Sequence, residues 1–321
     1  MRIMLFATLA VLATSCRPQG PYATETRCIT TAWETLEQLG DEPCPGWSST
    51  HFAVLLVTDS TEYLFGHPYP SDDFAADPSF LGPGTVVSRP RMFPPNLLAT
   101  MPAVNGLPTV VIGTLANTGL SPGEWTSTLL HEHFHQVQFN RPGYYDGVNA
   151  LELSGGDETG MWMLNYPFCY TDTAVVHAFD RYRSALLAAF APGSTGMNAR
   201  NDMIAAARRA LFTGLSPKDA RYLDLQLWQE GTARSMEQHV LELLVAKDIT
   251  WKEIDADTRS LAQAVETNAM EELTRTDLAN DQRICFYAVG WAEARLAVHR
   301  GASFWRSYFE QPFTTATYFQ R

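Results

Sequence analysis

Residues 131–135, of sequence His-Glu-His-Phe-His, constrain this chain more than any other stretch. They contain the pattern H-E-x-x-H, in which His131 and His135 are four residues apart. On an α-helix, residues i and i+4 lie on the same face, one turn apart. Two imidazoles in this arrangement can ligate one metal ion, with the Glu132 carboxylate beside them to accept a proton. The pattern therefore predicts a metal-binding helix.

The residues around this pattern predict a helix from about Pro122 to Phe139. Ser121 stands at the N-cap position, Pro122 occupies the first helical position, and Glu124 completes a capping box. The apolar residues that follow form a stripe: Trp125, Leu129, Leu130 and Val137. The sequence Asn-Arg-Pro-Gly at 140–143 ends the helical pattern.

A catalytic zinc site needs a third protein ligand, because such sites hold three protein ligands and leave the fourth position for water. Glu230 is the best candidate, since it lies near the middle of a helix expected over 217–247. A carboxylate buried there without a partner is costly, so it needs a metal or a cation. Gly231, which costs about 1 kcal/mol relative to Ala inside a helix, indicates the close approach of another helix.

Other carboxylates remain open as the third ligand. Glu237 lies seven residues after Glu230, on nearly the same helix face, and is the main rival. An ion pair between Glu230 and Arg234, one turn later, would remove Glu230 from the metal. Three more acidic candidates come before this helix: Glu152, Asp157 and Glu158. His133 points about 200° away from His131 around the helix axis, so we expect it to be structural or to support a ligand.

Two segments resemble those of the gluzincins, the thermolysin-like superfamily of zinc metallopeptidases: H-E-H-F-H at 131–135 and W-Q-E-G-T-A at 228–233. In that group, two helix histidines and a glutamate on a later helix bind zinc. The resemblance implies that Glu132 is the general base. It also implies that Zn²⁺ is bound by three residues: His131, His135 and Glu230.

A third segment, Y-A-V-G at 287–290, is similar to the Y-x-x-G helix of many gluzincins. A tyrosine of that region can stabilise the oxyanion, which implies a catalytic role for Tyr287, with His239 as an alternative donor. The G-x-M-E-N segment that holds a free amino terminus in the related aminopeptidases is missing. The resemblance therefore implies an endopeptidase that acts on peptides or proteins.

The chain also departs from the gluzincin pattern. Glu230 follows His135 by 95 residues (230 − 135), which is much longer than in the thermolysin type. Arg234 stands where an aspartate often orients a histidine. The residues that orient His131 and His135 therefore stay open.

Residues 1–15 are expected to be a signal peptide. Arg2 supplies a short basic region, and the apolar run that follows is too short to span a bilayer. Cys16 comes after Ala-Thr-Ser in a lipobox-like context. We therefore expect lipid anchoring at Cys16 in the bacterial periplasm or outer membrane, with secretion as the alternative. The net charge of −12, without a basic run, argues against nucleic-acid binding.

The chain has five cysteines, and lipidation of Cys16 would leave four. Four cysteines suit two disulfides in an oxidising compartment. We expect Cys28 to pair with Cys44, because they bracket a helix predicted over 29–39. The second expected pair joins Cys169 to Cys285. The alternative is that one or both pairs remain buried thiols.

Hydrophobic patterning predicts an α+β fold. Strands are expected at 52–58 and 109–113, with 63–65 as the hairpin partner of the first. Loops with short strands are expected between 66 and 108, and an irregular segment over 143–172. Later residues are nearly all helical: 174–190, 199–212, 217–247, 258–274, 283–299 and 302–310. These patterns predict a small β-containing N-terminal lobe at 16–140, which ends in the metal helix, and a helical C-terminal lobe at 141–321.

Three functions are compatible with these patterns. The expected one is an exported zinc metalloendopeptidase. The others are a partner-binding lipoprotein with a structural or inactive metal site, and another metal-dependent hydrolase. Glu132 separates the first two, because a purely structural site needs the ligands but not this carboxylate.

Overall fold

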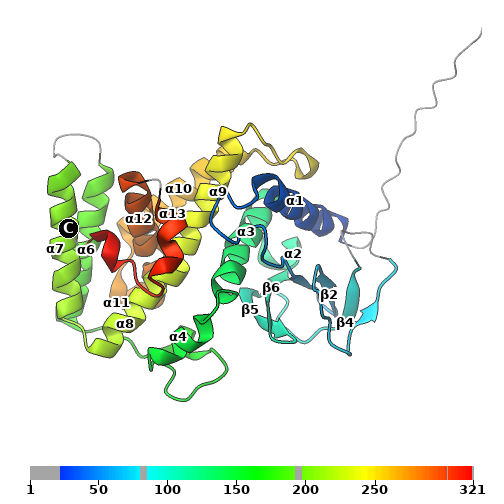
Figure 1. Ribbon diagram of the computed structural model, residues 1–321, viewed down its shortest axis with the longest axis horizontal. Coiled ribbons are helices and arrows are strands. Elements are labelled where there is room, and N and C mark those ends of the chain that lie inside the picture. The colour runs from blue at the N-terminus through cyan, green and yellow to red at the C-terminus, as the bar shows by residue number, and fades with distance from the viewer. Residues whose placement is uncertain (1–21, 80–84, 192–196, 302, 320–321) are drawn as a thin grey trace, which may run out of the picture.

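The computed structural model describes residues 22–79, 85–191, 197–301 and 303–319 (Figure 1). It confirms the α+β class, with a six-stranded sheet in the N-terminal part and a mostly helical C-terminal part. The expected signal peptide and the lipid anchor at Cys16 lie outside the described residues. Among the residues that are described, no helix is long and apolar enough to cross a membrane.

The sheet has the strand order β3-β4-β2-β1-β6-β5. Its strands are β1 (Val54–Val57), β2 (Thr61–Phe65), β3 (Ala75–Ala76), β4 (Val87–Pro90), β5 (Leu98–Val104) and β6 (Leu107–Gly113). β1 runs parallel to β6, and the other neighbouring strands are antiparallel. The expected hairpin is present as β1 and β2. β5 lies at one edge of the sheet.

The central strand β1 is buried on both faces. Successive side chains of a strand point to opposite faces, so Val54 and Leu56 enter the main core while Leu55 and Val57 enter a smaller cluster. Helices α1 (Ala23–Leu39) and α3 (Pro122–Phe139) contribute to the main core. This core extends from Cys28 to Phe319 and so joins the sheet to the C-terminal helices.

Helix α3 has the bounds that the sequence predicts, and its capping box is formed between Ser121 and Glu124. The Trp125 indole donates a hydrogen bond of 2.9 Å to the carbonyl of Gly113, at the end of β6. α3 lies between the sheet and helix α9 (Thr232–Ala246), as Figure 1 shows. The predicted metal helix is therefore fixed to the sheet on one side and to the helical part on the other.

Most of the expected helices after residue 172 are present with small shifts at their ends. The helix expected over 302–310 is instead the four-residue helix Phe304–Ser307 followed by the 3-10 turn Tyr308–Glu310, and residue 302 lies outside the described residues. The further helices are α2 (Leu115–Thr118), α4 (Tyr144–Ala150), α5 (Trp162–Asn165), α6 (Thr173–Phe190), α7 (Met197–Thr213), α8 (Pro217–Gln226), α10 (Thr258–Arg275), α11 (Leu278–Asp281), α12 (Cys285–Arg300) and α13 (Phe304–Ser307). One difference concerns the helix predicted over 217–247. A π-helical turn, Leu227–Gly231, joins α8 to α9 within it.

The predicted disulfides are wrong in this structure, because Cys28, Cys44, Cys169 and Cys285 are all free thiols. The Cys28 thiol donates to the carbonyl of Pro122 at 3.7 Å, and the Cys285 thiol to that of Asp277 at 3.4 Å. Burial raises the pKa of Cys28 and of Cys285 to about 11, so both stay neutral. A disulfide requires a specific separation and direction of the Cβ atoms, which spacing along the chain does not specify.

Candidate metal centre

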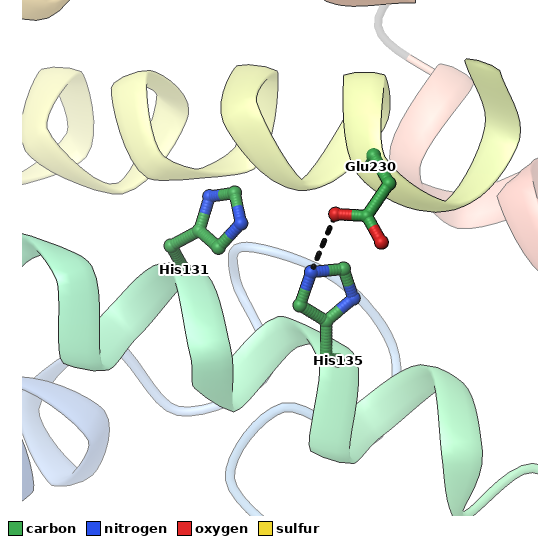
Figure 2. A group of neighbouring side chains, drawn as sticks. All are labelled: His131, His135 and Glu230. Atoms are coloured by element: carbon green, nitrogen blue, oxygen red, sulfur yellow. Dashed lines mark ion pairs between the residues drawn. The ribbon is translucent and has the colours of Figure 1, made fainter. Parts of the chain in front are cut away.

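The structure brings the three predicted ligands together. His131, His135 and Glu230 each offer one ligand atom, and these atoms all lie within 4.8 Å of one another. Figure 2 shows both imidazoles directed from α3 toward the helix that carries Glu230. The His135 Nε2 atom is 3.6 Å from a Glu230 carboxylate oxygen. Both histidines are buried, with 8% and 5% of their surface exposed.

Glu230 lies in the π turn, where the usual helical hydrogen bonds are shifted by one residue. The carbonyl of Trp228 accepts hydrogen bonds from the hydroxyls of Thr232 and Tyr308. The Gln138 amide donates to the carbonyl of Gln229 at 3.2 Å. Such π turns are frequent at functional sites. Here side chains from three segments satisfy the carbonyls of the turn that presents Glu230.

The predicted close approach of a helix at Gly231 is confirmed, and the neighbour is α12. A Cβ atom on Gly231 would lie 2.2 Å from the Gly290 Cα atom, and one on Gly290 would lie 2.7 Å from the Gly231 Cα atom. Neither position has room for a side chain. The two glycines therefore allow α12 to support the back of the turn that carries Glu230.

His131 is oriented by Glu237, the rival ligand, which lies outside the ligand cluster. The Nδ1 atom of His131 is 3.7 Å from one carboxylate oxygen of Glu237. The other carboxylate oxygen accepts a hydrogen bond of 2.7 Å from the Ser127 hydroxyl. Burial opposes the charged carboxylate, but His131 and Arg234 lower the pKa of Glu237 to about 2. Glu237 thus supports a ligand, and leaves the other ring nitrogen of His131 free to face the cluster.

Arg234 does not form the alternative ion pair with Glu230. Its guanidinium lies 3.3 Å from Glu272 and 3.9 Å from Glu237. Three other acidic candidates lie outside the cluster: Glu152, Asp157 and Glu158. Of the candidates considered, Glu230 is therefore the carboxylate that joins the two histidines.

His135 is oriented by Gln138, a residue that sequence reasoning missed. The Gln138 carbonyl oxygen accepts from Nδ1 of His135 at 2.7 Å, which leaves Nε2 facing Glu230. Burial opposes the charged imidazolium, but Glu230 raises the pKa of His135 to about 9. Burial likewise opposes ionised Glu230, whose pKa His135 and His131 lower to about 2. The i, i+3 spacing of His135 and Gln138 was the available sequence signal.

Glu132 lies beside the cluster but outside the ligand set. Its carboxylate accepts a hydrogen bond of 2.8 Å from the hydroxyl of Thr100, on the edge strand β5. The same hydroxyl is 2.8 Å from the backbone carbonyl of Glu132. Thr100 therefore ties the carboxylate to both the strand and the helix. The sequence carried no signal for this contact.

Tyr287 lies next to the site, where its phenol is near enough to Glu230 to help lower the pKa of that carboxylate. The Arg283 guanidinium donates to the Tyr287 hydroxyl at 3.2 Å. Tyr287 is thus a neighbour of the third ligand. The alternative donor, His239, instead stacks on Trp305 with a distance of 5.5 Å between ring centroids.

His133 has the structural role expected for it. Its two ring nitrogens lie 2.9 Å from the carbonyl of Trp47 and 2.9 Å from the side-chain oxygen of Gln136. Burial lowers the pKa of His133, so the ring is neutral. It therefore fixes α3 to the loop that follows α1, on the side of the helix opposite the metal ligands.

The donor set fits zinc, which is commonly bound in catalytic sites by imidazole nitrogens and a carboxylate. Each of the three ligand side chains also has an orienting neighbour within the chain, which for Glu230 is the Gln229 amide that donates to it at 3.3 Å. No protein-family model, curated protein or solved structure matches this chain. The geometry of the site is therefore what indicates the function.

Proposed function

We propose that this protein is a zinc-dependent peptidase, with a peptide or protein as its substrate. The observation that carries the proposal is the convergence of His131, His135 and Glu230, with Glu132 held beside them and outside the ligand set. A zinc ion held by these three ligands would polarise a substrate carbonyl and lower the pKa of a water molecule.

Glu132 is the proposed general base. Its carboxylate accepts a proton from the attacking water and then delivers it to the leaving amine nitrogen. The Thr100 hydroxyl holds one carboxylate oxygen, which limits the rotation of the side chain. A purely structural metal site has no use for a carboxylate positioned in this way, and this favours hydrolysis over a partner-binding role.

The edge strand β5 is the proposed binding site for the peptide backbone. Among the strands that the structure describes, β5 has one hydrogen-bonded neighbour, β6, and it packs against α3. An extended peptide can add to such an edge through backbone hydrogen bonds. Because Thr100 belongs to β5, a peptide bound there passes close to Glu132.

The substitution Glu132→Gln tests this proposal, because glutamine is nearly isosteric and Glu132 is not a ligand. We expect full zinc content and an unchanged fold, but hydrolysis of a peptide library slower by about 10²-fold or more. Equal cleavage by wild type and variant would assign the activity to a contaminant or another site. Absence of cleavage by the zinc-loaded wild type between pH 5 and pH 9 would favour the partner-binding role.

We also propose that the protein is exported and anchored by a lipid on Cys16 in the bacterial cell envelope. The support is the lipobox-like sequence before Cys16, preceded by a short basic and apolar segment. The variant Cys16→Ser should move the protein from the membrane fraction to the soluble fraction. An unmodified Cys16 thiol, observed by mass spectrometry in the native host, would contradict the anchor.

A further inference from the structure

Arg283 is a cation beside the metal centre that the proposed mechanism does not use. It lies in the short 3-10 turn Gln282–Ile284 that leads into α12, and it is partly buried. Its guanidinium donates to the Tyr287 hydroxyl at 3.2 Å, and the Tyr287 phenol lies near the Glu230 carboxylate. One phenol therefore separates the guanidinium from the third metal ligand.

The surroundings of Arg283 differ from those of other arginines near this core. Arg208 pairs with Asp224 and Glu293, and Arg295 pairs with Glu242 at 2.7 Å. Arg283 takes part in none of the ion pairs formed within the described residues. The polar group that its guanidinium contacts directly is a phenol, which does not neutralise its charge at neutral pH.

The guanidinium carbon of Arg283 lies over the Tyr287 ring, 5.7 Å from its centroid. Burial opposes its charge, but Tyr287, Glu230 and Tyr222 raise the pKa of Arg283, so it stays charged. Tyr170 is also near enough to interact with it. Of these neighbours, Glu230 is the carboxylate, and a bound metal would take up its charge. Arg283 would then lie in a partly buried position without an anion, which is costly.

We propose that Arg283 binds a carboxylate group of the substrate next to the scissile bond, an inference that rests on the proposed peptidase function. A guanidinium has five N–H donors, and one or two can hold Tyr287 while others face a carboxylate in a bidentate pair. Tyr287 orients Arg283 and Glu230 relative to each other. Arg283 is thus a specificity-determining residue for acidic peptides.

The carboxylate has two possible sources in a peptide. The C-terminal carboxylate would make the protein a carboxypeptidase and would replace the expected endopeptidase action. The side chain of an Asp or Glu residue would keep endopeptidase action but direct it to acidic sequences. The chemistry at Arg283 is the same in both cases, so the substrates must distinguish them.

The test compares matched peptides in wild type and Arg283→Met. One pair of peptides differs in a free or amidated C-terminus, and another in a Glu or Gln residue next to the cleaved bond. We expect kcat/KM for the carboxylate-bearing member of one pair to fall about 10- to 100-fold, the scale for losing a hydrogen bond to a charged group. The neutral member should fall much less, and its fall measures the part of the effect that comes through the contact with Tyr287.

Two further variants make the comparison specific. Arg283→Lys keeps the charge but not the planar fork, and should lose part of the preference for the carboxylate. Arg259→Met removes an exposed arginine of α10 and should leave the preference unchanged. An equal fall for charged and neutral peptides in Arg283→Met would overturn the proposal, as would an unchanged preference.

A binding measurement separates this proposal from the peptidase proposal. Calorimetry with zinc-loaded Glu132→Gln compares an N-acetyl dipeptide with its C-terminal amide, and N-acetyl-Glu amide with N-acetyl-Gln amide. We expect one acid to bind more tightly than its neutral counterpart. This difference in affinity should be lost when Arg283→Met is added. This result would support carboxylate binding by Arg283 even if no peptide were cleaved. Equal binding of acid and neutral ligands would overturn carboxylate binding by Arg283 and leave the peptidase proposal intact.

Discussion

The two helical segments that supply the metal ligands reach the site in different ways. α3 is a regular helix, and its i, i+4 spacing alone places His131 and His135 on one face. Glu230 lies in a π turn whose position depends on distant residues, among them Gln138, Tyr308 and Gly290. The histidine half of the site thus follows from local helix geometry, and the Glu230 half follows from the tertiary packing of distant segments.

The largest expected effect is the loss of a ligand from either half. His135→Ala and Glu230→Gln should each reduce zinc affinity by more than about 10²-fold, because supporting residues alone contribute 10- to 100-fold. Metal analysis of protein purified without chelator measures the zinc content, and competition with a chromogenic chelator measures the affinity. If Glu230→Gln keeps wild-type affinity, the π turn is not part of the metal site.

The pH dependence of zinc binding tests the contact between the two halves. In the metal-free protein Glu230 raises the pKa of His135 to about 9, so His135 is protonated at pH 7 and must lose a proton to bind zinc. The pKa of Glu230 is about 2, so Glu230 releases none. Zinc affinity should therefore rise about tenfold per pH unit from pH 7 toward pH 9.

Calorimetry in buffers of different ionisation enthalpy counts these protons directly. We expect His135 to release about one proton per zinc ion at pH 7. The variant Glu230→Gln is the matched control, because it removes the carboxylate that holds the proton on His135. Proton release that is the same in wild type and in this variant would mean that Glu230 and His135 do not interact.

The supporting residues should give a smaller effect that also separates the halves. Glu237→Gln loosens His131 alone, whereas Gln138→Leu loosens His135 and also removes a donor to the π turn. Each should lower zinc affinity about 10- to 100-fold. Gln138→Leu should in addition lower the free energy of unfolding of the metal-free protein by about 1–3 kcal/mol, because it leaves buried polar groups unpaired.

Urea denaturation of the metal-free variants measures this second effect. Arg259→Met, an exposed change on α10, serves as the control for stability. Equal unfolding free energies for Gln138→Leu and wild type would show that the π turn does not depend on Gln138.

The same division explains how far the sequence could predict this molecule. The start of α3 follows from Ser121, Pro122 and Glu124, which all act within the first turn of the helix. Glu230 and the close packing at Gly231 were predictable because a carboxylate buried without a partner is costly, and so is a glycine inside a helix. The α+β class and most helices follow from hydrophobic periodicity, which is also local.

What the sequence could not predict depends on contacts between distant segments. Thr100 and Glu132 are 32 residues apart, and Ser127 and Glu237 are 110 apart. Glu237 was predicted as a rival ligand because the sequence indicated the helix face on which it lies but not its contact with Ser127. The disulfides failed for the same reason, since Cys28 faces the start of α3.

The π turn also makes the site sensitive to the number of residues in the chain. A π turn amounts to one residue inserted into an α-helix, and each residue of an α-helix rotates the chain by about 100°. Deleting one residue between Leu227 and Gly231 would leave a continuous and well-formed helix. It would nevertheless rotate α8 by about 100° relative to α9, and the carbonyls of the turn would lose the partners that hold Glu230 in place. Insertions and deletions in this short stretch would therefore abolish metal binding while leaving the helix, and most of the fold, in place.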